Sequence, residues 1–168
     1  MATFGKNLSN VSYDKLNLPE ELEIAVIRST WNSEITEKLA DGAVETLVKA
    51  GLKEGNIHLY QVPGSYELPL GAQWAFEIWN VHGVVCLGSI IRGETSHFDY
   101  VSQAVSQGIK DVSLKYNKPV AFGVLTDDNL QQSIDRSGGK HGNKGVEAAM
   151  TVLEMISLSY DYNRIKRI

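Results

Sequence analysis

The sequence predicts a single-domain α/β protein, a three-layer α/β/α sandwich around a four-stranded parallel sheet. Three observations predict this fold: four apolar, β-branched runs start roughly thirty residues apart, helical stripes lie between them, and two of the runs are almost continuously apolar. Strands without polar alternation are typical of parallel sheets that helices cover on both faces.

The four strands are expected where the apolar runs occur: Leu22–Ile27, Ile57–Val62, Val84–Ile91 and Val120–Leu125. Four helices are expected from apolar residues spaced three or four apart: residues 35–47, 69–80, 101–116 and 146–156. Gly51 and Pro119 mark the ends of the first and third helices, and Pro69 suits a first turn. The resulting order, with each strand followed by a helix, is that of a flavodoxin-like sandwich.

Composition excludes several classes of function. The 168 residues carry a net charge of −4 without a long basic run, so neither nucleic acid nor an anionic membrane surface is an expected partner. The one cysteine, Cys86, lies in an apolar run and predicts a buried thiol in a reducing compartment. No stretch resembles a secretory signal or spans a bilayer, so a cytoplasmic location is expected.

The two ends of the chain carry weaker patterns. Residues 1–21 predict an extended N-terminal arm, which a lone globular unit would leave mobile, before a domain at residues 22–168. At the other end, Arg164, Lys166 and Arg167 suit the negative end of the last helix.

The predicted fold limits where a ligand can bind, because ligands of open α/β sheets bind beyond the carboxyl ends of the strands. Four connections meet at that edge: Ser29–Ser33, Pro63–Glu67, Arg92–Asp99 and Thr126–Asn129.

The third connection carries the strongest signal. Glycine and small hydroxyl residues precede the start of a helix there, a pattern that gathers backbone N–H groups for an anion. His97 lies beside this anion cradle and exchanges protons near neutral pH. A single histidine is more often structural, but this position favours a catalytic role. His58, His82 and His141 receive no role.

The first two connections allow two interpretations each. Trp31 could stack on a planar ligand, but taken alone it is expected to pack against a helix, the commoner case for an isolated aromatic residue. Ser65 and Glu67 could cap the following helix and offset its dipole, and they could also hold a ligand together with the stiff Pro63–Glu67 backbone, since the two roles are compatible.

The segment Arg136–Gly145 is rich in glycine and basic residues. It does not match the P-loop pattern, because Lys144 is not preceded by glycine or followed by serine or threonine. A flexible surface loop is therefore the simple interpretation. Arg136 is nevertheless suited to bidentate binding of a phosphate.

Several motifs are missing from the sequence. A dinucleotide GxGxxG after the first strand, a GxSxG nucleophile elbow and any metal-ligand spacing of His, Cys, Asp or Glu do not occur. The remaining interpretation is acid–base chemistry by one histidine on a phosphorylated substrate, with an aromatic residue for a planar partner.

Four segments, in this order and spacing, resemble the lumazine synthase family: Trp31–Asn32, Val62–Pro69, Gly93–Asp99 and Gly142–Gly145. The resemblance runs from about Glu23 to the last helix. It implies condensation of 5-amino-6-(D-ribitylamino)uracil with 3,4-dihydroxy-2-butanone 4-phosphate to give 6,7-dimethyl-8-ribityllumazine, the penultimate step of riboflavin biosynthesis. It implies no metal and no organic cofactor.

The resemblance also implies roles for individual residues, with His97 as the catalytic residue. Residues that would contact the pyrimidine and its ribityl chain are Trp31, Asn32, Ser65, Tyr66, Glu67, Ser89, Ile90 and Ile91, with Phe122 and Lys144 reaching it from a neighbouring subunit. The butanone phosphate would be held by Glu94, Thr95 and Arg136. Two positions depart from the family pattern: Thr30 replaces a frequent arginine, and the Glu94 carboxylate brings a like charge near the phosphate unless it turns outward.

The resemblance further implies self-association into pentamers. The helical stripes at Val101–Tyr116 and Val146–Ile156 support association, because they offer more apolar surface than one small sheet covers. Family members that stop at pentamers tend to carry extra residues between the last two helices, so the short Arg136–Gly145 connection implies, by the same resemblance, closure into an icosahedral shell enclosing riboflavin synthase. Pentamer, decamer and shell all stay open at this point. A non-catalytic flavin- or lumazine-binding module is the alternative function, but a module that only binds the ring needs neither His97 nor Arg136.

Overall fold

The computed structural model describes the backbone of residues 7–165 and the side chains of residues 7–162. Four parallel strands form the central sheet in the order β2-β1-β3-β4. Their bounds are β1 Ile24–Ser29, β2 Ile57–Val62, β3 Gly83–Ile91 and β4 Val120–Asp127. All four predicted strands are confirmed, although β1 begins at Ile24 rather than Leu22.

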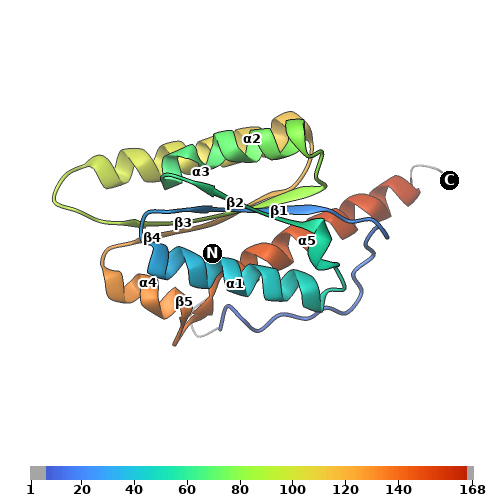
Figure 1. Cartoon of the computed structure of the whole chain (residues 1–168), viewed down its shortest axis with the longest axis horizontal. Helices are drawn as coiled ribbons and strands as arrows, with labels where there is room; N and C mark the ends of the chain where they lie inside the picture. The colour runs from blue at the N-terminus through green and yellow to red at the C-terminus, as the bar shows by residue number, and fades with distance from the viewer. Residues whose placement is uncertain (1–6, 166–168) are drawn as a thin grey trace.

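Helices cover both faces of the sheet, as Figure 1 shows. The helices α2 (Leu68–Ile78) and α3 (His97–Tyr116) lie on one face, and α1 (Ser33–Lys49) and α5 (Lys144–Ile165) lie on the other. The three-layer flavodoxin-like sandwich is therefore confirmed. Short 3₁₀ turns η1 (Glu54–Asn56) and η2 (Ser65–Glu67) flank β2.

The hydrophobic core has two parts, one on each face of the sheet, because successive side chains of the central strands point to opposite faces. Ile24 and Val26 of β1 point to α1 and α5, whereas Ala25 and Ile27 point to α2 and α3. The run Gly83–Leu87 of β3 is fully buried on both faces. Because successive side chains point to opposite faces, an unbroken apolar run is what a doubly covered strand requires.

One helix and one hairpin were not predicted from the apolar pattern. The helix α4 (Leu130–Arg136) follows β4 and leads into the hairpin β5 (Ser137–Gly139) and β6 (Gly142–Asn143). In α4 the apolar periodicity is reversed, since Ser133 is buried while Leu130 and Ile134 are exposed. Its start is instead marked by Asn129, whose side chain accepts a hydrogen bond from the Gln132 backbone N–H at 3.1 Å.

The segment before β1 has no helix or strand but follows the body of the domain from residue 7 onward. The Leu8 backbone N–H donates to the His141 carbonyl at 2.8 Å, and the Asn17 N–H donates to Ser157 Oγ at 2.8 Å. Leu16 and Leu18 pack against the core under α1 and α5. From residue 7 onward, the arm is thus in contact with the domain through hydrogen bonds and two leucines.

Some expectations for the termini lie outside what the structure describes: residues 1–6 of the predicted arm, residues Lys166 and Arg167, and the side chain of Arg164. Within residues 7–165, none of the helices combines the length and the apolar character that crossing a membrane requires.

Candidate active site

A cleft of about 1120 Å³ opens at the carboxyl edge of the sheet. Its walls come from the connections after β1, β2 and β3 and from the first half of α3. Ten of the predicted site residues line it together: Trp31, Asn32, Ser65, Tyr66, Glu67, Ser89, Ile90, Ile91, Thr95 and His97.

The connection after β1 presents an aromatic surface to the cleft. Trp31 is 72% exposed, so the alternative in which it packs against a helix is wrong. Asn32 adopts a left-handed backbone conformation (φ 57°), and its Nδ2 donates to the Ser89 carbonyl at 2.9 Å. Thr30 Oγ1 donates to the Pro63 carbonyl at 2.9 Å. These two contacts tie the loop that carries the indole to the neighbouring strand ends.

The connection after β2 is a tight 3₁₀ turn that its own carboxylate stabilises. The Gly64 backbone N–H donates to Glu67 Oε2 at 2.9 Å, while Tyr66 is 63% exposed. The alternative role of Ser65 as a helix cap is wrong, because α2 has Glu67 at its N-cap position and no side-chain capping hydrogen bond. Ser65 is instead buried against Gly88, where an added Cβ would overlap the Ser65 hydroxyl. Glycine at position 88 therefore lets β3 approach this turn.

The connection after β3 leads directly into α3, whose first residue is His97. The His97 backbone N–H donates to Thr95 Oγ1 at 3.3 Å, and the His97 side chain is exposed in the cleft. Gly93 and Thr95 line the cleft, whereas Glu94 does not. The exposed loop residues 93–96 and the positive end of the 20-residue helix α3 thus adjoin His97.

Four predicted site residues do not line the cleft of this chain: Glu94, Phe122, Arg136 and Lys144. Phe122 is half-buried and packs against the core between the sheet and α2–α3. Lys144 is paired with Glu147 one turn along α5. Arg136, at the end of α4, lies with its Nε 4.0 Å from Asp127 Oδ1.

Asp127 is a buried carboxyl group at the end of β4. Burial raises its pKa above the ordinary value, and the Ser133 hydroxyl, which donates to Oδ2 at 2.8 Å, and Arg136 offset only part of that effect. The Ser133 hydroxyl also lies 3.4 Å from the Ser89 hydroxyl. Polar contacts at the ends of β3 and β4 therefore hold α4 where apolar packing does not.

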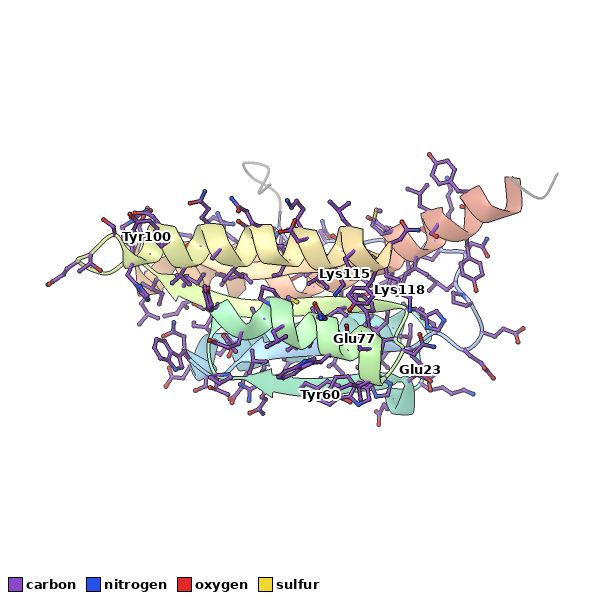
Figure 2. All side chains as sticks on the ribbon, turned by 90° about the horizontal axis from the view of Figure 1, so that it is seen from above. Glu23, Tyr60, Glu77, Tyr100, Lys115 and Lys118 are labelled. Carbon is purple, nitrogen blue, oxygen red and sulfur yellow. The ribbon has the colours of Figure 1, made fainter. Side chains whose placement is uncertain are left out.

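Sequence reasoning missed one wall of the cleft, which α3 supplies. Its residues are Tyr100, Val101, Gln103, Ala104 and Gln107. Most of them follow His97 at helical spacings of three, four or seven, so the helical period applied to His97 would have found this face. Figure 2 shows Tyr100 at one end of α3, with Glu77, Lys115 and Lys118 gathered toward the other end.

The arrangement can serve a two-substrate reaction. Trp31 and Tyr66 offer aromatic surfaces for a planar ring, the Gly93–Thr95 amides suit an anion, and His97 lies beside them as a proton-transfer group. Among the residues that the structure describes, no group of three or more His, Cys, Asp or Glu side chains is placed to hold a metal ion.

Comparison with known proteins gives a consistent result. The family model described as 6,7-dimethyl-8-ribityllumazine synthase matches residues 21–160. A protein of that name from Cytophaga hutchinsonii is 52% identical over 157 residues, which cover 94% of this chain and 98% of the relative. A protein of the same name from Parabacteroides distasonis is 46% identical over 95% of this chain and 99% of its own length. Another, from Flavobacterium johnsoniae, is 45% identical over 98% of this chain and 90% of its own length.

Proposed function

This chain belongs to the 6,7-dimethyl-8-ribityllumazine synthase family, and from that premise we propose that the cleft at the carboxyl edge of the sheet is its active site, with His97 as the proton-transfer residue. The protein is a transferase of riboflavin biosynthesis. It condenses 5-amino-6-(D-ribitylamino)uracil with 3,4-dihydroxy-2-butanone 4-phosphate and releases 6,7-dimethyl-8-ribityllumazine, phosphate and water.

The pyrimidine is assigned to the side of the cleft formed by β1, β2 and β3. The exposed face of Trp31 suits stacking on the ring, and the Ser65–Glu67 turn offers a hydroxyl, a phenol and a carboxylate for the ribityl hydroxyls. Glu67 already accepts from Gly64, but a carboxylate has capacity for further donors. Asn32 and Ser89–Ile91 complete this side.

The phosphate of the second substrate is assigned to the Gly93–Thr95 backbone at the start of α3. Amide donors and the helix dipole favour an anion there without any side-chain charge. The Glu94 side chain is exposed and is not part of the cleft lining, so its carboxylate does not oppose this assignment. Arg136 supplies the guanidinium for bidentate binding, from a position outside the cleft of its own chain.

The reaction needs two reactants held together and several protons moved. The amine attacks the ketone, water leaves as an imine forms, phosphate is eliminated, and the second amine condenses with the remaining carbonyl, so that the ring closes with loss of a second water. Each step transfers a proton, and a positioned histidine contributes about 10²–10⁴-fold to such transfers. Fixing both reactants in one cleft contributes up to ~7–11 kcal/mol in favourable cases.

The assembly follows from the residues that the cleft lacks. We assign Phe122, Arg136 and Lys144 to the cleft of a neighbouring copy, in a cytoplasmic homo-oligomer built from pentamers and closed into an icosahedral shell around riboflavin synthase. The stripe of α3 offers little spare apolar surface, since Val105 and Ile109 are buried in the chain's own core. Support comes instead from α2, where Leu70, Trp74 and Ile78 form an exposed row at spacings of four.

The observation that carries the proposal is the presence of His97, Thr95 and Trp31 in one cleft. The test mixes the purified protein with both substrates and follows the absorbance and fluorescence of the lumazine. We expect product formation that depends on both substrates. If the protein binds the pyrimidine or lumazine but forms no product, it is a ring-binding module and the proposal is wrong.

A further inference from the structure

Arg92 stands directly after β3, and three groups hold its side chain. Its Nε donates to Asp128 Oδ1 at 2.9 Å, and its Nη1 donates to Asp99 Oδ1 at 3.2 Å. The guanidinium carbon also lies 4.0 Å from the centre of the Phe98 ring, within the range of a cation–π contact. The Arg92 backbone N–H donates to the Asp127 carbonyl at 2.9 Å.

These contacts join two elements that border the cleft. Asp128 follows the last residue of β4, whereas Phe98 and Asp99 belong to the first turn of α3, immediately after His97. The intervening residues 93–96 are exposed, and no atom lies within 4 Å of a Cβ built on Gly93. Since the loop itself is weakly held, the position of the imidazole depends on how the first turn of α3 is fixed to the sheet.

The same contacts make Arg92 unsuited to binding the substrate phosphate. Two carboxylates share one guanidinium, so the cluster carries a net negative charge, and Arg92 is not among the residues that line the cleft. The hydrogen bond to Asp128 is the main cause that raises the pKa of Arg92, with further contributions from Asp99. Arg92 thus differs from Arg136, whose distance of 4.0 Å from Asp127 leaves its guanidinium able to bind another anion.

We propose that Arg92 is a positioning residue that acts through His97: it braces the first turn of α3 against the end of β4 and so holds the imidazole at the reacting atoms. This inference rests on the proposed function of the cleft. The planar guanidinium is needed because it forms two divergent hydrogen bonds and stacks on Phe98 at once. A lysine ammonium cannot reproduce that geometry.

A double-mutant cycle tests the proposal. Arg92→Ala should lower kcat roughly 10-fold or more, since small displacements of a catalytic group are costly, and should leave KM for the pyrimidine nearly unchanged. His97→Ala and the double variant should have the same kcat, because Arg92 has nothing left to position once the imidazole is gone. Arg92→Lys should recover only part of the loss. If the two losses multiply in the double variant, Arg92 acts independently of His97, and if KM for the butanone phosphate is what changes, Arg92 acts on the substrate; either result overturns the inference.

Two further variants separate the brace from general effects on the protein. Asp128→Ala removes only the β4 side of the brace, the acceptor of the Arg92 Nε hydrogen bond, and should show a smaller loss of kcat of the same kind. Lys110→Ala removes an exposed ion pair with Asp111 elsewhere on α3 and should leave kcat unchanged. Because exposed ion pairs contribute little to stability, we expect each variant to keep the thermal midpoint and native mass of the parent.

The cycle also distinguishes this inference from the proposed function. A parent protein that makes no lumazine contradicts the proposed function itself. A parent that is active, together with an Arg92→Ala variant of equal kcat, contradicts the positioning role alone.

Discussion

His97 lies where three features of the proposed active site meet: the Gly93–Thr95 backbone, the positive end of α3 and the open cleft. His97→Ala should lower kcat by about 10²-fold or more while the affinity for the pyrimidine changes little, because the imidazole moves protons rather than anchoring a ligand. Steady-state kinetics and fluorescence titration of the pyrimidine measure the two effects. Full turnover in the variant would remove His97 from the mechanism.

Arg136 is the residue assigned to the phosphate. Arg136→Ala should raise KM for the butanone phosphate far more than KM for the pyrimidine, because a charge-assisted bidentate contact is lost from one substrate only. Arg136→Lys should recover part of the affinity, since an ammonium keeps the charge but not the fork. An equal rise of both KM values would instead indicate a structural role at the end of α4.

Asp127 gives a prediction about stability and pH. Burial raises the pKa of this carboxyl in the folded state above its value in the unfolded state. The charged carboxylate therefore lowers the free energy of unfolding at pH values above the folded-state pKa, whereas below the unfolded-state pKa the group is protonated in both states and has no such effect. Asp127→Asn should therefore raise the thermal midpoint at neutral pH, and the difference should shrink as the pH falls to about 4. Asp111→Asn, which changes an exposed carboxylate on α3, is the control. A midpoint of Asp127→Asn that is lower than the parent's at neutral pH would contradict this prediction.

At the scale of elements, the contact of α5 with α1 depends on one glycine. A Cβ at Gly145 would overlap the Leu39 carbonyl oxygen of α1, and backbone cannot move aside as a flexible side chain does. Gly145→Ala should therefore reduce the free energy of unfolding by about 1–3 kcal/mol, the usual cost of overpacking. Urea denaturation measures the loss. Gly55→Ala, where no atom lies within 4 Å of the added Cβ, should unfold like the parent.

At the scale of the whole molecule, the mass of the native particle tests the proposed assembly. If Phe122, Arg136 and Lys144 complete a neighbour's cleft, activity should require a closed ring, since a repeated head-to-tail contact closes only in a ring. Native mass spectrometry or light scattering should give a multiple of five chains, and a shell should give a much larger particle than a single ring. One pentamer or decamer would contradict the shell, and an active monomer would contradict the shared site.

The resemblance to the lumazine synthases implied most of the cleft-lining residues, whereas the sequence by itself determined the four strands of the central sheet and four of the five α-helices that the structure describes. Local periodicity was enough for these, because a doubly covered strand such as β3 must be apolar throughout and a covering helix such as α1 must repeat its apolar residues every third or fourth position. Parallel topology then brought the ends of β1, β2 and β3 to one edge, so Trp31, Ser65 and His97 could be expected in one cleft before any coordinates.

Only the tertiary structure decided the features that rest on polar contacts between distant parts of the chain. The helix α4 is held by the buried hydrogen bond from Ser133 to Asp127 rather than by an apolar face. Its sequence therefore has no apolar periodicity from which the helix could be predicted. The brace of Arg92 depends on Asp128, 36 residues further along, whose approach follows from the pairing register of β3 with β4. The sequence does not distinguish a charged residue that faces water from one that pairs with a distant partner, because charged residues need no periodic spacing. Only the packing of the strands therefore decides which carboxylate each arginine pairs with.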